Sequence, residues 1–389
     1  AQNNQILMVS LVLLYKPLYV SVTYMQIQHN GTQLCQVTLD LPSPPCAVWV
    51  HLVCAFRYGR DDLDVIGLSY RKDIWIEQQQ IYPPTGSKTP NTPMQDILLK
   101  KAGDQSYPFI FNMPTNLPCS VTLQPGPDDK GKPCGIDFEV KTYIAKEADN
   151  PDEQVDKKDT ARLLIRKIQF APNKTGAGPK ASLSKQFMLS DKLVHVDAYM
   201  EKEICYHGEP IPIRIKINNE TNKVVKKIKV TVDQTTDVVL FSADKYTKNV
   251  LNEEFEEMVE ASSTYDKTLN ITPMLAHNKE KRGLALDGKL KEEDTNLAST
   301  TMLRPGMEKE VLGILVFYKI KIVLMVSRGG DVAVELPLVL MHPKPAGKKQ
   351  TGSGGQETMR SCLLNENLTR SRMFVVSGSN FSIICKDLQ

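Results

Sequence analysis

Two aspartates and one arginine are the residues of this chain whose types and spacing best fit a buried charge cluster. Asp287 and Asp294 lie in the segment RGLALDGKLKEEDTNLAST, with Lys289 and Lys291 between them. Arg166 stands far upstream in ARLLIRKIQF, where an alternating strand pattern calls for an apolar side chain. A buried guanidinium stays charged and requires partners. We therefore expect Arg166 to pair with the two aspartates, in a cluster that an incoming anion could break.

A less specific interpretation of the same three residues stays open at the level of the pattern. Arg166 could extend its guanidinium along an apolar surface to solvent, while the aspartates cap turns. The two interpretations differ in the burial of Arg166, because only the charge cluster requires its side chain to be enclosed.

Lysine runs are the second group of candidate binding residues. Such runs are usually solvated strand faces, but faces that converge would form a shallow basic surface suited to phosphates. No aromatic residues are interleaved with them, which argues against a nucleic acid as partner. Three runs contribute: Lys100 and Lys101; Lys226, Lys227 and Lys229; Lys319 and Lys321.

An apolar tip inside a charged segment is the third candidate. In YGRDDLDVIGLSYRKD, the residues Asp64, Val65, Ile66, Gly67 and Leu68 lie between strongly charged flanks. Exposed apolar residues in a loop are costly unless they insert into a partner. An ordinary β-hairpin is the alternative interpretation of this segment.

Patterns typical of catalysis are missing from the chain. There is no GxSxG, HExxH, P-loop or dinucleotide-binding pattern in a strand–helix context. The six histidines are isolated in sequence, and His207 in CYHGEP is expected in a turn rather than as a metal ligand. We expect no catalytic residue, metal or cofactor. A β-sandwich carbohydrate-active enzyme with paired carboxylates is a rival, yet Trp49 and Trp75 offer little platform for a sugar.

Composition and periodicity favour an all-β protein. The chain has 389 residues, 24 prolines and a formal net charge of +3, so the molecule as a whole is not a binder of polyanions. Runs such as IPIRIKIN and KIKVTV alternate as half-buried strands do. One short helix is predicted over Thr92–Gly103, from a Thr cap, an early Pro and a final Gly. The scattered cysteines are expected to be reduced thiols of a cytosolic protein. The apolar run ILMVSLVLLY is too short to span a bilayer and is expected to form a strand.

The organisation predicted from these patterns is two β-sandwich domains in tandem, with the helix in the first. The first domain is expected over residues 1–171 and the second over 187–345. Residues 172–186 lack a strand pattern and are the candidate linker. The tail over 346–389 is rich in Gly, Ser, Lys and Gln and is expected to be flexible, with a terminal strand that docks back.

Several long segments together resemble the arrestin family, and they resemble visual (rod or cone) arrestins more closely than beta-arrestins. The resemblance is collinear and runs from about Val48 to Pro345. Residues 1–47 and 346–389 depart from the family's pattern, including its lysine-bearing start and its acidic tail. The segments that carry the resemblance are CAFRYGRDDLDVIGLSYRKD, NLPCSVTLQPGPDDKGKPCGIDFEVK, RLLIRKIQFAP, YHGEPIPI, KRGLALDGKLKEEDTNLAST, VLGILV and LPLVLMHPKP.

The resemblance implies a cytoplasmic, non-enzymatic protein that binds an activated, phosphorylated G-protein-coupled receptor and blocks G-protein coupling. For a visual member the receptor is an opsin, the cell is a photoreceptor and membrane contact comes through the receptor. Inositol phosphates are a further candidate ligand, and an arrestin-like trafficking adaptor is the alternative function. The resemblance implies that Arg166 senses phosphate. It also implies that Asp287 and Asp294 pair with the side chain of Arg166. The residues that approach receptor phosphates would be Lys289, Lys291, Lys100 and Lys101. The segment around Asp64–Leu68 would enter the receptor.

Overall fold

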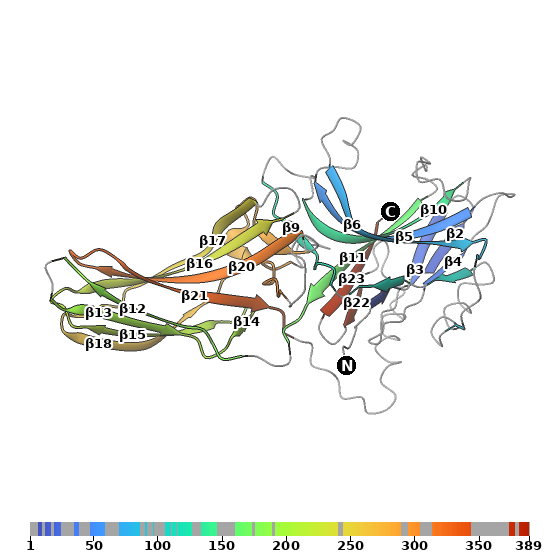
Figure 1. The fold of residues 1–389 in the computed structure, drawn as a ribbon. Helices are drawn as coiled ribbons and strands as arrows, with labels where there is room; N and C mark the ends of the chain where they lie inside the picture. Colours follow the sequence, from blue (N-terminus) through green and yellow to red (C-terminus); the bar gives the residue numbers. More distant parts are fainter. Residues whose placement is uncertain are drawn as a thin grey trace, which may run out of the picture. The chain divides into compact units, whose positions relative to one another are not determined.

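The chain forms two compact groups of strands, each described here by itself (Figure 1). Unit 1 comprises Ala1–Ser120, Cys134–Ile168 and Pro345–Gln389, and unit 2 comprises Val121–Pro133 and Gln169–Lys344. The computed structural model describes residues 7–9, 12–16, 19–24, 35–38, 47–58, 70–85, 90–91, 96, 106–109, 111–114, 116–126, 134–145, 160–172, 176–188, 191–239, 244–288, 295–303, 313–343, 373–377 and 381–388.

Unit 1 is built on the sheet order β6-β5-β10-β11-β23-β22, with a second sheet in the order β3-β2-β4-β7 and the pair β1-β8. Tyr58 of β5 pairs with Tyr70 of β6, so these long strands flank the segment that carries the apolar tip. The strand bounds are β1 Leu7–Val9, β2 Val12–Lys16, β3 Tyr19–Tyr24, β4 Cys35–Thr38, β5 Ala47–Tyr58, β6 Tyr70–Tyr82, β7 Ser106–Phe109, β8 Phe111–Met113, β10 Cys134–Ala145, β11 Thr160–Gln169, β22 Met373–Ser377 and β23 Phe381–Leu388.

The core of unit 1 follows from alternation along β5 and β10. Val48, Val50 and Leu52 of β5 are fully enclosed, as are Ile136 and Phe138 of β10. Burial of such side chains stabilises the sheet by about 1.5–3 kcal/mol each. The same alternation places intervening residues such as Trp49 and His51 on the other face.

His51 gives unit 1 a dependence on pH. Its Nε2 lies 2.8 Å from the hydroxyl oxygen of Tyr143 on β10. Burial, and next the charge of Lys141, lower the pKa of His51 from 6.5 to about 4. Between pH 6.5 and about 4, His51 is therefore protonated in the unfolded chain but stays neutral in the folded chain.

We expect the free energy of unfolding to fall as the pH is lowered from 6.5 to 4, and His51→Gln to remove about 1–2 kcal/mol of that fall once solvent screening is allowed for. Urea unfolding of both proteins at a series of pH values measures the difference. The exposed His277→Gln serves as the control. An equal pH slope in wild type and His51→Gln would contradict the expectation.

Unit 2 contains a four-stranded sheet in the order β12-β13-β15-β18 and a five-stranded sheet in the order β14-β21-β20-β16-β17, which Figure 1 shows as two layers. A short antiparallel pair, β9 with β19, belongs to the same unit. The bounds are β9 Val121–Leu123, β12 Lys180–Gln186, β13 Leu193–Tyr199, β14 Ile204–Tyr206, β15 Ile211–Asn219, β16 Val225–Val238, β17 Asp244–Phe255, β18 Ser263–Ile271, the 3-10 turn η4 Leu275–Asn278, β19 Ala285–Asp287, β20 Ile314–Val326 and β21 Val332–Met341.

Regular alternation builds the core of unit 2. β15 buries every second residue, including Ile213 and Ile215, and exposes Arg214 between them. β20 and β21 do the same, so the two sheets bring one apolar face each to the shared interior. A buried amide, Gln234 of β16, extends this interior toward β19, because its Oε1 accepts a hydrogen bond from Ala285 N at 2.8 Å.

The prediction of an all-β fold is confirmed, and most predicted strands are present. Val332–Met341 is β21, and the strand predicted over 211–218 is β15. The alternating run over residues 117–123 also predicts a strand, but only Val121–Leu123 forms one, which is β9. Pro118 has no N–H to pair, and Ser120 N donates instead to Lys167 O at 2.9 Å.

Three other predictions have mixed outcomes. The expected absence of a strand over the candidate linker 172–186 is wrong for Lys180–Gln186, which forms β12 and pairs along its length with β13. Of the helix predicted over Thr92–Gly103, only Asp96 is described, with helical backbone. The predicted terminal strand is present as the antiparallel pair β22 and β23, whereas the domain bounds themselves stay predictions.

Cysteines and the apolar start of the chain agree with the sequence pattern as far as they are described. Cys54, Cys119, Cys134 and Cys205 form no disulfide. Part of the run ILMVSLVLLY forms β1 and β2. Within the described part of the chain, no helix has the length and apolar character needed to cross a membrane.

Candidate functional site

Arg166 lies inside unit 1 rather than at its surface. It follows the fully enclosed Ile165 on β11 and has only 2% of its surface exposed. Lys167 is also buried, and its Nζ donates to Leu117 O at 2.5 Å. The alternative in which Arg166 reaches solvent is therefore wrong, because the described side chain is enclosed.

Unit 1 supplies an acidic partner for this charge that the sequence did not reveal. Burial raises the pKa of Asp137 on β10 to about 6, and the charges of Arg166 and then Arg57 act against that rise. Arg57 itself forms an ion pair with Glu139, which is 1% exposed. In the segment GIDFEVK, Asp137 and Glu139 are two residues apart, which is typical of a strand face exposed to solvent. The pattern therefore predicts exposed acids, whereas in the structure both carboxylates are part of a charge network inside unit 1.

Asp287 is a buried carboxylate at the end of β19 in unit 2, with 8% of its surface exposed. Its Oδ1 accepts from Ser299 N at 2.9 Å, and its Oδ2 accepts from Ser299 Oγ at 3.1 Å. Burial opposes ionisation, but the hydrogen bond with His342, the charge that His207 or His342 carries when protonated and the backbone hydrogen bond from Ser299 together outweigh it and lower the pKa of Asp287. The carboxylate is thus fixed in its charged form.

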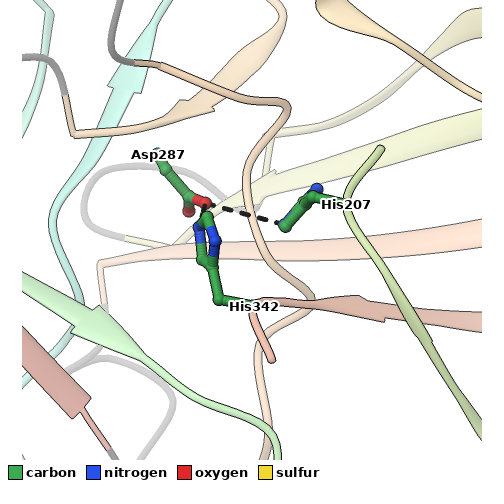
Figure 2. A group of neighbouring side chains, drawn as sticks. All are labelled: His207, Asp287 and His342. Atoms are coloured by element: carbon green, nitrogen blue, oxygen red, sulfur yellow. Dashed lines mark hydrogen bonds and ion pairs between the residues drawn. The ribbon is translucent and has the colours of Figure 1, made fainter. Parts of the chain in front are cut away.

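Two histidines converge on the same carboxylate oxygen (Figure 2). His342 Nε2 lies 2.6 Å from Asp287 Oδ2, and His207 Nε2 lies 3.7 Å from it. The two rings are 4.6 Å apart between centroids. Burial lowers the pKa of His207 to about 4, although Asp287 acts in the opposite direction. His207 is therefore a neutral imidazole beside a charged carboxylate.

Backbone pairing fixes both histidines. His207 directly follows β14, and its N–H donates to Met341 O at 3.1 Å. His342 directly follows β21, forms a parallel bridge with Phe170, and accepts at its carbonyl from Ala171 N at 3.0 Å. The parallel pairing of β14 with β21 thus places two residues far apart in sequence at one end of the sheet.

The prediction that the histidines are isolated is wrong for this pair. His207, Asp287 and His342 form a group whose possible metal-ligand atoms all lie within 4.8 Å of one another. No local pattern could have found the group, because the three residues lie at the ends of three separate strands and only the fold brings them together. The turn predicted at His207 is confirmed, and it does not exclude a ligand role.

Lysines of β16 and β20 share one face of the five-stranded sheet. Thr231 pairs with Lys321 and Asp233 with Lys319, so the lysines of the two neighbouring strands alternate with buried residues on the same side. Glutamates interrupt this basic surface: Lys227 and Lys229 lie 3.5 and 3.8 Å from Glu254, and Lys319 lies 3.0 Å from Glu335. Lys226 is exposed beside the bulge that follows Val225.

Several predicted site residues lie outside the described residues, and their roles stay predictions. Arg166 and Asp287 belong to different units, so their pairing is likewise a prediction. The residues outside the described part are Asp64, Val65, Ile66, Gly67, Leu68, Lys100, Lys101, Lys289, Lys291 and Asp294.

Comparison with known proteins matches both parts of the chain to one family. The model described as "Arrestin (or S-antigen), N-terminal domain" matches residues 36–171, and "Arrestin (or S-antigen), C-terminal domain" matches residues 190–345. The N-terminal match begins before Val48, so it includes part of the segment that departs from the resemblance.

Relatives of high identity carry the name Arrestin-C. The protein of Aquarana catesbeiana is 60% identical over 308 residues, which cover 77% of this chain and 78% of the relative. The Homo sapiens protein is 57% identical, covering 77% and 79%. The Mus musculus protein is 51% identical over 331 residues, covering 82% and 86%. The chain belongs to the arrestin family, whose members are receptor-binding regulators of signalling.

Proposed function

We propose that this chain binds an activated, phosphorylated G-protein-coupled receptor, an opsin in a photoreceptor cell, and blocks its coupling to G protein. In this proposal the chain acts in the cytoplasm and moves to membranes that contain the receptor. Inositol phosphates are a second class of phosphate ligand for its lysines. The observation that carries the proposal is the burial of Arg166, which keeps a permanent positive charge out of water.

A receptor phosphate would act on this charge by competition. In this proposal Arg166 interacts with the carboxylate of Asp137, whose ionisation it favours, and pairs with Asp287 and Asp294. Removing one partner of a buried pair costs about 3–5 kcal/mol. A phosphate carries a charge of about −2 with strong acceptor oxygens, so it can replace a carboxylate partner without leaving the guanidinium unpaired. Lys289 and Lys291 would bind the same group. The charge of Arg166 is then paired both before and after binding, first with carboxylates and then with the phosphate. The phosphate shifts the equilibrium because it binds the second state more tightly than the first.

Receptor activation would be read separately, by the segment Asp64–Leu68. A requirement for both inputs makes binding selective without any chemical step. The test is a pull-down with phosphorylated and unphosphorylated opsin, each in light and dark. The proposal expects strong retention only by the phosphorylated receptor in light, and equal retention in all four states would overturn it.

The apolar tip gives a prediction of its own. Replacing Val65, Ile66 and Leu68 together by alanine should weaken binding to the activated, phosphorylated receptor by at least about tenfold, since burial of each such side chain contributes roughly 1.5–3 kcal/mol. Titration of the receptor with labelled protein measures the change. Ile76→Ala is the matched control, because Ile76 is 49% exposed on β6 outside this segment. Unchanged affinity in the triple variant would reject insertion of the tip.

A further inference from the structure

We propose that His207, Asp287 and His342 form a binding site for one divalent first-row transition-metal ion, with Zn²⁺ as the ion that fits best. The three side chains come from three separate segments of unit 2, and both imidazole rings face the carboxylate of Asp287 (Figure 2). All three ligand atoms lie within 4.8 Å of one another. Receptor binding plays no part in this inference.

The donor set selects the class of metal. Two nitrogens and one oxygen suit Zn²⁺ and its neighbours, whereas Ca²⁺ and Mg²⁺ prefer oxygen alone. Zinc sites with three protein ligands hold water in the fourth position. Ser299 Oγ lies 3.0 Å from His207 Nε2 and 3.1 Å from Asp287 Oδ2, where it can accept a hydrogen bond from such a water.

Burial and orientation favour binding at this point. The side chains of His207 and Asp287 are 6% and 11% exposed, so few waters compete for the ligand atoms. The side chain of His342 is 19% exposed, which leaves the group within reach of solvent. Ser299 N donates to Oδ1 and Ser299 Oγ donates to Oδ2, and these bonds orient the Asp287 carboxylate as outer hydrogen bonds do for metal ligands.

Little movement would convert the observed arrangement into a metal site. Ligand atoms about 2.1 Å from a tetrahedral ion lie roughly 3.3–3.4 Å apart. The separation of 3.7 Å between His207 Nε2 and Asp287 Oδ2 is close to that distance, and the 2.6 Å separation at His342 Nε2 must widen by about 0.7 Å. Metal binding requires each Nε2 to be without a proton, so a neutral ring that carries its proton on Nε2 moves it to Nδ1 when the ion binds. The competing explanation is a hydrogen-bonded network that never binds metal.

Cobalt and zinc titrations of the full chain, purified without metal and kept reduced, test the proposal. Co²⁺ should bind one ion per chain and give the visible absorption of a tetrahedral nitrogen and oxygen site, without the near-ultraviolet band of a thiolate ligand. Zn²⁺ should displace it at one equivalent. His207→Gln and His342→Gln should each weaken binding at least about tenfold, since even outer partners of metal ligands contribute 10- to 100-fold. His277→Gln, on the exposed part of η4, should bind as wild type does.

Each other outcome overturns the assignment. Absence of binding by wild type leaves only the hydrogen-bonded network. A thiolate band, or equal loss in His277→Gln, places the ion elsewhere. Should a variant fail to fold by circular dichroism, ¹⁵N-histidine spectra of wild type decide the matter: Zn²⁺ must shift two Nε2 resonances and fix both rings as the Nδ1–H form, and unshifted resonances reject the site. Failure here leaves the receptor proposal standing, because the titration contains no receptor.

Discussion

Arg166→Glu is expected to bind light-activated receptor that carries no phosphate at least about tenfold more tightly than wild type does. The new carboxylate repels the acids around it, including Asp137, whose ionisation Arg166 favours in the wild type. The phosphate would no longer be needed to separate a buried pair whose disruption costs about 3–5 kcal/mol. Equilibrium binding to unphosphorylated, illuminated receptor measures the gain.

The control for this variant is Arg214→Glu. Arg214 forms an exposed two-bond ion pair with Asp266, so its reversal alters surface charge without touching a buried group. Asp294→Arg should act in the same direction as Arg166→Glu, because it also removes an acid from the proposed cluster. If both variants kept the phosphate requirement of wild type, the charge switch would be rejected. Urea unfolding run alongside shows whether either variant loses the fold.

Gln234→Leu should lower the free energy of unfolding of unit 2 by about 1–3 kcal/mol. The Gln234 Nε2 donates to Ala285 O at 2.9 Å and to the hydroxyl of Tyr318 at 2.7 Å, while its Oε1 accepts from Ala285 N. Leucine has similar size but leaves the buried N–H of Ala285 unpaired, which costs about 1–3 kcal/mol, whereas the Ala285 C=O keeps the hydrogen bond that it accepts from Ala298 N at 2.9 Å. Urea unfolding measures the loss.

Thr235→Val is the matched control for Gln234→Leu. The neighbouring Thr235 hydroxyl makes an exposed bond to Thr247 on β17, so its loss should change stability by no more than about 0.5 kcal/mol. If the two variants lost the same free energy of unfolding, the buried amide of Gln234 would contribute no more to stability than the exposed hydroxyl of Thr235. Since Ala285 begins the strand that ends at Asp287, Gln234→Leu should also weaken the proposed zinc site.

The sequence predicts the parts of this fold that depend on local alternation. β15 and β21 bury every second residue, and their bounds could be predicted from period-two runs alone. Arg166 was recognisable for the same reason, as a charge inside an apolar series. Asp137 misleads the same reasoning, because an acid beside another acid two residues on looks like a solvated face.

The histidine group could not be predicted because no local rule connects its members. The parallel pairing of β14 with β21 brings His207 and His342 together, and the pairing of β9 with β19 fixes the strand that carries Asp287. Such long-range pairings depend on which sheets form, rather than on any single segment. β12 was missed for a different reason. Its sequence is mostly polar and shows no strand pattern, because its partner β13 supplies most of the apolar residues of the pair.

β16 lies between β17 and β20 and pairs with both over almost its whole length. Amides held on both sides exchange with deuterated solvent only when the sheet opens as a whole. Backbone deuteration should therefore reach the middle of β16, around Val230 and Val232, last of all in unit 2. The outer strand β12, which has β13 on one side only in its sheet, should take up label early.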